Sequence, residues 1–140
     1  MIVKNKMAVK IPAKSVNESL ARLVVASFVS QLDPTIDAMA DIKTAVSEAV
    51  TNCIVHAYKN EGGIVHINCK YDEKNTVTIQ VRDTGCGIED VGKATAPLFT
   101  TDKTGERSGM GFSIMESFTD KLSVSSKVGK GTTVTMKKKL

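Results

Sequence analysis

The hydrophobic period of this chain changes near residue 60, and that change restricts the possible folds more than any other feature. Apolar residues recur at helical spacing over 16–32 and again from Pro34 to about residue 58, which predicts two amphipathic helices. Over 64–71 and 76–82 the period is two, which predicts antiparallel strands joined by a short polar turn. The chain therefore combines two long helices with a hairpin.

The remaining segments continue this mixture of strands and helices. Residues 2–11 alternate loosely and end at Pro12, which predicts an edge strand. Residues 110–118 return to helical spacing, and 121–126 with 132–138 predict a final hairpin. The order β-α-α-β-β-loop-α-β-β predicts an α+β fold. We expect a two-layer sandwich in which the helices pack on one face of a mixed, mainly antiparallel sheet.

Two local motifs predict where the helices begin. In Ser15-Val16-Asn17-Glu18, the serine is expected to cap the first helix while Glu18 reaches back to it, as in a capping box. At the second helix, Asp33 is expected to cap the free N–H groups. Pro34 then suits the first helical position, where a backbone donor is not needed.

The composition narrows the class of protein. A chain of 140 residues, 41% of them hydrophobic, has the size of one domain, which we expect to span residues 1–140. Its core should be mainly aliphatic, because the chain has no Trp and only 4 Phe and 2 Tyr. The three cysteines form no C-x-x-C pair, so disulfides and structural zinc are disfavoured and a reducing compartment is expected.

Neither a membrane nor a nucleic acid is an expected partner. No apolar run approaches the roughly 20 residues of a membrane span, and the N-terminus lacks the apolar segment of a signal peptide, so we expect a cytoplasmic protein. The net charge is only +4, and Lys137 to Lys139 are interpreted as a solvated, solubilising tail. The few aromatic residues offer no platform for stacking single strands.

Glu48, Asn52 and His56 follow one another at four-residue spacing in the second predicted helix. Four residues advance a helix by about 400° and about 6 Å, so the three side chains share one stripe. A carboxylate can accept a proton or orient a nucleophile, and an amide oxygen suits Mg²⁺. Taken alone, the stripe is more typical of a solvated helix face than of a site, and His56 is equally explained as a half-buried residue at a helix end.

A second motif, Asp83-x-Gly85-x-Gly87, follows the strand predicted over 76–82. An aspartate there can accept a hydrogen bond from an exocyclic amino group such as that of adenine, and the glycines let the backbone pass close to a flat ring. The alternative is an ordinary Asp/Gly turn. A calcium loop is disfavoured because the further carboxylates of that motif are absent.

Residues 84–108 show neither period, and a loop of about 25 residues in a compact domain is usually functional, often a lid. Its end runs into Gly105-Glu106-Arg107-Ser108-Gly109-Met110-Gly111, just before the helix at 110–118. Glycines at a helix N-terminus expose N–H donors to an anion, and the guanidinium of Arg107 adds paired N–H donors for phosphate oxygens. The segment is not a Walker A loop. Gly131-Thr132 lies where a hairpin turn is the simpler interpretation.

Taken in order, these elements resemble the Bergerat-type ATP-binding fold shared by DNA gyrase, heat-shock protein 90, histidine kinases and MutL. The resemblance covers about residues 35–138. Glu48 and Asn52 match the N-box of that family, and the other matching residues belong to its three glycine boxes: Asp83, Gly85 and Gly87; Gly109 and Gly111; and Gly131 with Thr132.

A more specific resemblance is to the small anti-sigma factor kinases of spore-forming bacteria. It rests on Ser47-Glu48-Ala49-Val50-Thr51-Asn52, Pro97-Leu98-Phe99-Thr100-Thr101 and Glu106-Arg107-Ser108-Gly109-Met110-Gly111-Phe112, and it extends to the first strand and helix. The resemblance implies a homodimer that sequesters a sporulation sigma factor. It also implies the use of ATP and Mg²⁺ to phosphorylate a serine of an anti-anti-sigma factor.

The resemblance also implies a role for individual residues. Glu48 is the expected base for the serine hydroxyl, Asn52 the ligand of Mg²⁺, and Asp83 the residue that recognises adenine. Arg22, on the polar face of the first helix, is the expected contact for protein partners, although a solvated surface arginine fits equally well. The expected nucleotide-binding set is Asn52, Asp83, Gly85, Gly87, Thr101, Arg107, Ser108, Gly109, Gly111 and Thr132.

Two other functions are compatible with parts of this pattern. One is the ATP-binding catalytic domain of a sensor histidine kinase or related ATPase. Such a kinase should carry an upstream helical hairpin with a phosphoacceptor histidine, and residues 1–34 contain no His. The other is a binding module with a vestigial nucleotide site, which would have no need of a base such as Glu48.

Overall fold

The computed structural model describes residues 2–95 and 111–140, and these form a five-stranded sheet with helices packed against it. In chain order the elements are β1 (Val3–Pro12), α1 (Asn17–Val29), a 3₁₀ turn η1 (Ser30–Leu32), α2 (Ile36–Thr51), a π-helical stretch η2 (Asn52–Ala57), β2 (Ile64–Asp72), β3 (Thr76–Asp83), α3 (Val91–Ala94), α4 (Gly111–Phe118), β4 (Lys121–Lys127) and β5 (Gly131–Lys139).

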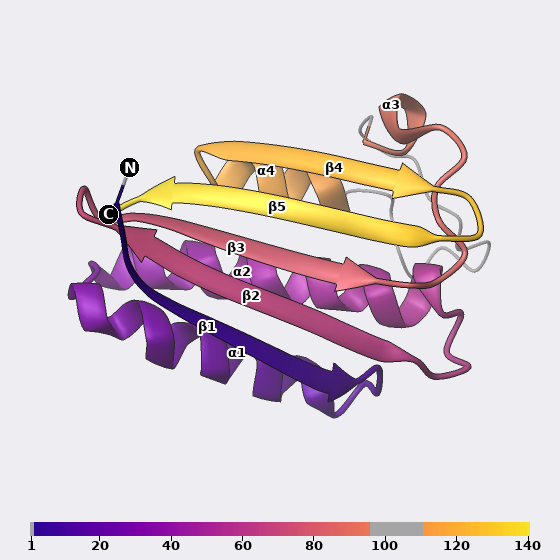
Figure 1. Ribbon diagram of the computed structural model, residues 1–140, viewed down its shortest axis with the longest axis horizontal. Coiled ribbons are helices and arrows are strands. Elements are labelled where there is room, and N and C mark those ends of the chain that lie inside the picture. The colour runs from indigo at the N-terminus through magenta and orange to yellow at the C-terminus, as the bar shows by residue number, and fades with distance from the viewer. Residues whose placement is uncertain (1, 96–110) are drawn as a thin grey trace.

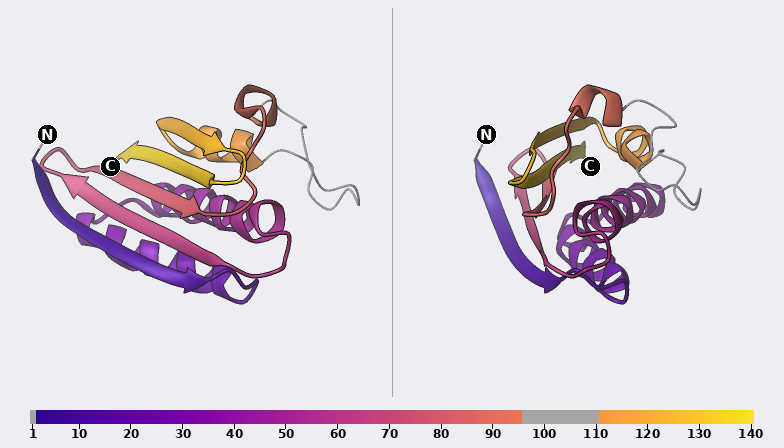
Figure 2. Two further views of the ribbon diagram at one scale, coloured as in Figure 1. Left: turned by 45° about the vertical axis from the view of Figure 1, so that its right-hand side comes forward. Right: turned by 90° about the vertical axis from the view of Figure 1, so that its right-hand side faces the viewer.

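The strands follow the order β1-β2-β3-β5-β4, and each neighbouring pair is antiparallel. The sheet lies in front of α1, α2 and α4 in Figure 1, and the end-on view in Figure 2 shows these helices on one side of it. The predicted α+β sandwich is therefore confirmed, with β1 at a sheet edge as expected. The pairing among the described strands is wholly antiparallel rather than mixed.

The core lies between the sheet and the helices. Alternate residues of β2 and β3 face the helices and are buried, namely Val65, Ile67, Cys69, Val77, Ile79 and Val81. Val46 and Val50 of α2 are fully buried with them in one cluster. Each such aliphatic side chain contributes about 1.5–3 kcal/mol by leaving water. The predicted aliphatic core is thus confirmed.

Both predicted helix caps are wrong. Helix α1 follows Val16 without a side-chain cap, because Glu18 points to α2, where its Oε2 accepts a hydrogen bond from Thr51 Oγ1 at 2.9 Å. At α2 the capping oxygen comes from Thr35, which accepts from the backbone N–H of Ala38 at 3.1 Å. Asp33 instead ends η1 in the left-handed region, with φ of 49°.

The lysines at the C-terminal end belong to the sheet rather than to a tail. Lys137 to Lys139 lie in β5 and pair with β3. Because side chains alternate along a strand, Lys137 and Lys139 are exposed while Lys138 points toward the helices. There it forms an ion pair with Asp41 of α2 at 3.4 Å and donates to the carbonyl of Phe118 at 3.2 Å.

Two further findings concern the helices and cysteines. The segment predicted as a loop at 84–108 contains the short helix α3, whose N-terminus is capped by the side chain of Asp90. Cys53, Cys69 and Cys86 are all free, and burial raises the pKa of the Cys69 thiol to about 12. Across residues 2–95 and 111–140, the helices are too short or too polar to span a membrane.

Candidate nucleotide-binding site

The predicted site residues that the structure describes gather at one end of the molecule. Helix α2 continues there into η2, strand β3 ends at Asp83, and α4 begins at Gly111. In Figure 1 this is the right-hand end, where the arrow of β3 terminates. Segments far apart in the sequence therefore meet as the predicted order of motifs requires.

The helical stripe is not a single α-helix. Helix α2 ends at Thr51, and a wider π-helical turn begins at Asn52, whereas the sequence predicted regular helix to about residue 58. Turns of this type occur frequently at functional sites. Glu48 and Asn52 keep α-helical spacing, since the backbone N–H of Asn52 still reaches the carbonyl of Glu48. His56 lies inside this π-helical stretch, one residue before its end at Ala57.

Gly111 brings α4 against this stripe. A Cβ atom added to Gly111 would lie 3.2 Å from Asn52 Oδ1 and 3.4 Å from Glu48 Oε2. Both side chains are half-buried, and the absence of a side chain at residue 111 lets them approach the start of α4 closely. The structure thus brings Glu48, Asn52 and Gly111 together.

Asp83 is buried, with 5% of its surface exposed. Its Oδ1 accepts hydrogen bonds from the backbone N–H groups of Gly85 at 2.9 Å and Thr132 at 3.2 Å. Burial raises the pKa of this carboxyl above its usual value, while hydrogen bonds from these two N–H groups and from the Cys53 thiol oppose that rise. Burial and the charge of Asp83 raise the pKa of Cys53 in turn.

The glycines around Asp83 allow other segments to approach closely. A side chain at Gly85 would collide with the carbonyl of Ala57, at the end of η2. Gly131 has φ of 120°, and a side chain there would collide with the carbonyl of Asp83. Gly87, with φ of 77°, lies in the same way against Lys127. The predicted glycine boxes therefore serve close contacts between η2, the end of β3 and the β4–β5 hairpin.

Thr132 serves the site through its backbone and through a neighbouring serine. Its N–H binds Asp83, and its hydroxyl lies 2.7 Å from Ser126 Oγ. Ser126 also accepts from the N–H of Ile88 at 2.8 Å and donates to the carbonyl of Gly131 at 3.0 Å. The β4–β5 hairpin thus bonds to Asp83, where the segment after β3 begins, and to Ile88 further along it.

Arg22 lies between α1 and α2 rather than in free solvent. Its Nη1 donates to Ser47 Oγ at 3.1 Å, Nη2 donates to Ser19 Oγ at 3.4 Å, and an ion pair with Glu18 spans 3.9 Å. The side chain is still 37% exposed. Because Ser47 precedes Glu48, Arg22 is linked by one hydrogen bond to the helix that carries the predicted base.

Several predictions lie outside the described residues. These are the nucleotide contacts of Thr101, Arg107, Ser108 and Gly109, and the part of the predicted lid from 96 to 108. In contrast, three residues that contribute to the site were not predicted: Cys53, Ser126 and Tyr58, whose hydroxyl accepts from the N–H of Thr84 beside Asp83. Their contacts join segments distant in the sequence, and no periodicity or motif marks such contacts.

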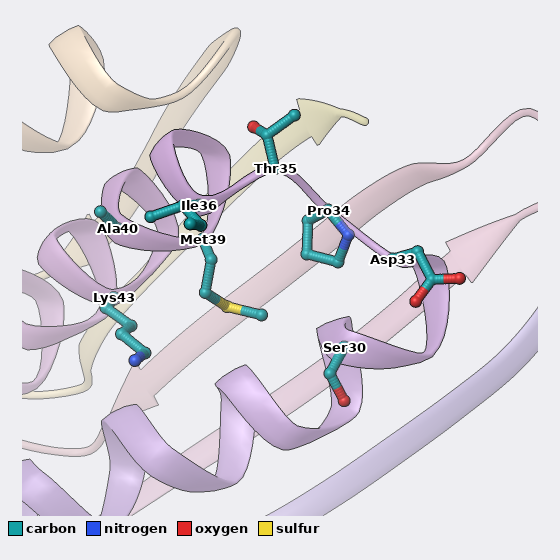
Figure 3. Close-up of a pocket in the computed structure, with 8 residues that line it drawn as sticks. All are labelled: Ser30, Asp33, Pro34, Thr35, Ile36, Met39, Ala40 and Lys43. Carbon is teal, nitrogen blue, oxygen red and sulfur yellow. The ribbon is translucent and has the colours of Figure 1, made fainter.

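A separate pocket of about 470 Å³ lies at the opposite end of α2. It is lined by residues at the junction of η1 and α2: Ser30, Asp33, Pro34, Thr35, Ile36, Met39, Ala40 and Lys43. Figure 3 shows Met39 and Lys43 extending from the helix beside it. It contains none of the predicted nucleotide-site residues.

Comparison with known families identifies the class. Residues 11–138 match the model of the histidine kinase-like ATPase domain, so nearly all of the fold described above falls within one family unit. The chain belongs to the histidine kinase-like ATPase domain family.

Curated relatives narrow the class further. An anti-sigma F factor of Clostridium acetobutylicum is 55% identical over 138 residues, covering 99% of this chain and 96% of the relative. Those of Caldanaerobacter subterraneus subsp. tengcongensis and Priestia megaterium are 59% and 51% identical, and the matches cover 96% and 99% of this chain and 93% and 95% of the relatives. Within its family the chain therefore belongs to the anti-sigma F factors, and the resemblance predicted from the sequence is confirmed.

Solved structures show the same fold at lower identity. The RsbU and RsbW domains of a Mycobacterium tuberculosis protein align with a TM-score of 0.71 at 17% identity, covering 98% of this chain and 32% of that one. The histidine kinase domain of a blue-light activated kinase from Erythrobacter litoralis aligns with a TM-score of 0.58 at 19% identity, covering 88% and 61%. Both likenesses concern the fold alone.

Proposed function

We propose that this protein binds and inhibits a sporulation sigma factor and uses ATP to phosphorylate a serine of an anti-anti-sigma factor. It acts in the cytoplasm as a homodimer, without a direct nucleic-acid or membrane partner. The name of its relatives, anti-sigma F factor, supports the first activity. The ATPase domain family supports the use of ATP.

The observation that carries the kinase activity is the meeting of Glu48, Asn52 and Gly111. A carboxylate beside an amide oxygen, both facing a glycine at a helix start, is suited to phosphoryl transfer. Glu48 accepts the proton of the serine hydroxyl. The serine oxygen bonds to the γ-phosphorus, and the bond from that phosphorus to the oxygen of ADP breaks. A binding-only module has no need of Glu48.

Asn52 fits the metal ion that such a reaction uses. Among residues 2–95 and 111–140, no group of three or more His, Cys, Asp and Glu residues could hold a metal ion. An amide oxygen with phosphate and water oxygens is a common environment for Mg²⁺, and Asn52 Oδ1 lies close to the start of α4 at Gly111. Bound there, Mg²⁺ would neutralise phosphate charge.

Asp83 is the residue that recognises adenine. Because its Oδ1 already accepts two backbone N–H groups, its second oxygen is oriented, and we assign that oxygen to the exocyclic amino group. The remaining nucleotide contacts are proposed for Gly85, Gly87, Thr101, Arg107, Ser108, Gly109, Gly111 and Thr132.

Arg22 is the proposed contact for protein partners. Its guanidinium is partly exposed and already oriented by Ser47 and Glu18, so little side-chain freedom is lost when a partner carboxylate binds. Arg22→Ala should reduce capture of the sigma factor in a pulldown and leave ATP affinity unchanged. Normal capture would contradict the assignment. Lys14→Ala, an exposed cation before α1, is the matched control.

The alternative is a catalytic domain of a sensor histidine kinase, to which the Erythrobacter litoralis structures point by fold alone. The relatives named anti-sigma F factor are matched over 93–96% of their own length in the comparisons above, which favours the first function.

One experiment tests the proposal against this alternative. The tagged protein is purified from a sporulating host, its bound proteins are identified, and ATP labelled at the γ-phosphate is added. We expect a sigma factor among the captured proteins and an acid-stable label on a serine of a different protein. An acid-labile label on histidine would favour the sensor kinase. The absence of any protein label, with ATP bound, would contradict kinase activity.

A further inference from the structure

Tyr58 is the first residue after η2, and its hydroxyl joins the start of β2 to the segment that follows β3. It donates to the carbonyl of Ile64 at the start of β2, at 2.7 Å, and accepts from the backbone N–H of Thr84 at 2.8 Å. The hydroxyl of Thr84 lies 3.3 Å away. Thr84 is the residue directly after Asp83.

The local structure is shaped to hold this ring. A side chain at Gly63 would overlap the ring of Tyr58, so the glycine leaves the space in which the ring lies. One residue earlier, the carbonyl of Ala57 accepts from the N–H of Cys86 at 3.1 Å. The end of η2 therefore binds the chain on both sides of Gly85.

This double attachment fixes the group that orients Asp83. The N–H of Gly85 donates to Asp83 Oδ1 at 2.9 Å, and its direction depends on where Thr84 and Cys86 lie. If the bond from Tyr58 to Thr84 is lost, the end of η2 holds this chain on one side of Gly85 only, and the N–H of Gly85 can turn away from the carboxylate.

The other tyrosine shows that this arrangement is specific. Tyr71 lies in β2, where its hydroxyl donates to Gln31 at 2.8 Å and its ring contacts that of Phe28 at 5.3 Å. Those contacts join β2 to α1 and η1, away from Asp83. Both tyrosines pack against the same core, so they differ in what the hydroxyl holds.

We propose that Tyr58 is a positioning residue for adenine recognition, acting through Thr84 and Gly85 on Asp83. The inference rests on the proposed function, because it takes Asp83 to be the adenine acceptor. The hydroxyl of Tyr58 bonds to Ile64 and Thr84, on the side of Asp83, so we expect it to control nucleotide affinity and not the rate of the chemical step.

The test is Tyr58→Phe, which keeps the ring and removes the hydroxyl. The bonds to Ile64 and Thr84 are both lost, and loss of the one to Thr84, which lies next to Asp83, should weaken ATP binding about threefold to tenfold, measured by calorimetry. The KM for ATP should rise by a similar factor while kcat at saturating ATP stays unchanged. Tyr71→Phe is the matched control and should leave ATP affinity unchanged. If Tyr58→Phe lowers only the free energy of unfolding and not ATP affinity, the proposal is wrong.

A double-mutant cycle with Asp83→Asn separates this proposal from the function on which it rests. If Tyr58 acts through Asp83, Tyr58→Phe should have little further effect on ATP affinity in the Asp83→Asn background. Full additivity of the two losses would overturn the proposal while leaving the adenine site in place. If Asp83→Asn alone leaves ATP affinity unchanged, the proposed adenine site itself fails.

Discussion

The two halves of the candidate site are held in different ways. On the adenine side, Asp83 is buried and fixed by backbone N–H groups from both of the segments that pack around it. On the phosphate side, Glu48 and Asn52 are half-buried and face Gly111 across a contact between two helices. Adenine recognition is thus built into the end of one strand, whereas phosphoryl transfer depends on how α4 meets α2. Changes on the first side should alter binding, and changes on the second should alter turnover.

The largest effect should come from the phosphate side. Glu48→Gln keeps the size of the side chain but removes the base, and general base catalysis typically contributes about 10²- to 10⁴-fold. We expect phosphorylation of the partner serine to slow by that factor, measured in single-turnover experiments, with ATP affinity nearly unchanged. Glu116→Gln, an exposed residue of α4, is the control. A wild-type rate for Glu48→Gln would remove it as the base.

Asp83→Asn should give the next largest effect, and on the other side of the comparison. The new amide would keep its oxygen on the N–H groups of Gly85 and Thr132 and so turn its NH₂ toward the amino group of adenine. Loss of a charged hydrogen bond worth about 1.5–3 kcal/mol predicts ATP affinity lower by about 10- to 100-fold. Calorimetry measures this. A lower kcat at saturating ATP, with normal affinity, would reverse the roles of the two sides.

The overall fold could be predicted from the sequence because it depends on local periodicity. The change from helical spacing to alternation gave the correct order of elements and the position of the hairpins. The predicted caps of both helices were wrong, although α1 begins within one residue of its predicted start, because tertiary contacts decide which side chains cap. Glu18 was expected to bond its own helix, but it is bound by Thr51 of α2, and Thr35 caps α2 in place of Asp33.

In the candidate site, too, the local motifs could be predicted and the tertiary contacts could not. Asp83 and its glycines were recognisable because the residues that need close approach lie next to one another. The groups that orient Asp83 could not be recognised in the sequence, since the N–H of Thr132 comes from 49 residues away and the Cys53 thiol comes from η2. The π-helical turn at Asn52 also has no signature in the apolar spacing, which continues unbroken through it.

A smaller effect, on kcat, should come from adding a side chain at Gly111, where α4 contacts α2. In Gly111→Ala, the new Cβ would lie 3.2 Å from Asn52 Oδ1, so Asn52 or Glu48 must move by a few tenths of an ångström. Small misplacements of reacting groups are costly, and we expect kcat to fall about tenfold. ATP affinity should change less than kcat. Gly92→Ala, where the nearest atom is 3.5 Å away, should leave kcat unchanged.

The smallest expected effect is on the pH dependence of ADP binding, which tests the adenine side alone. Burial raises the pKa of Asp83, and adenine requires the ionised carboxylate as an acceptor. Acidification through this raised pKa should therefore weaken ADP binding at a higher pH than an exposed aspartate would require. Calorimetric titrations of wild type and Asp83→Asn over a pH series measure this. Their difference removes the titration of the nucleotide phosphates, which is common to both.

The contribution of Asp83 to the free energy of unfolding should rise on acidification, whereas ADP binding should weaken. This opposite response makes the pH test specific to Asp83. A folded-state pKa above the unfolded value means that the folded protein takes up the proton first. The contribution of Asp83 to the free energy of unfolding should therefore increase as the pH falls through the folded pKa, and be complete below the unfolded one. Urea unfolding of the nucleotide-free protein measures it, with Asp83→Asn as the reference. If binding and stability of the wild type, relative to that variant, fell together on acidification, the pKa of Asp83 in the folded protein would be lowered rather than raised.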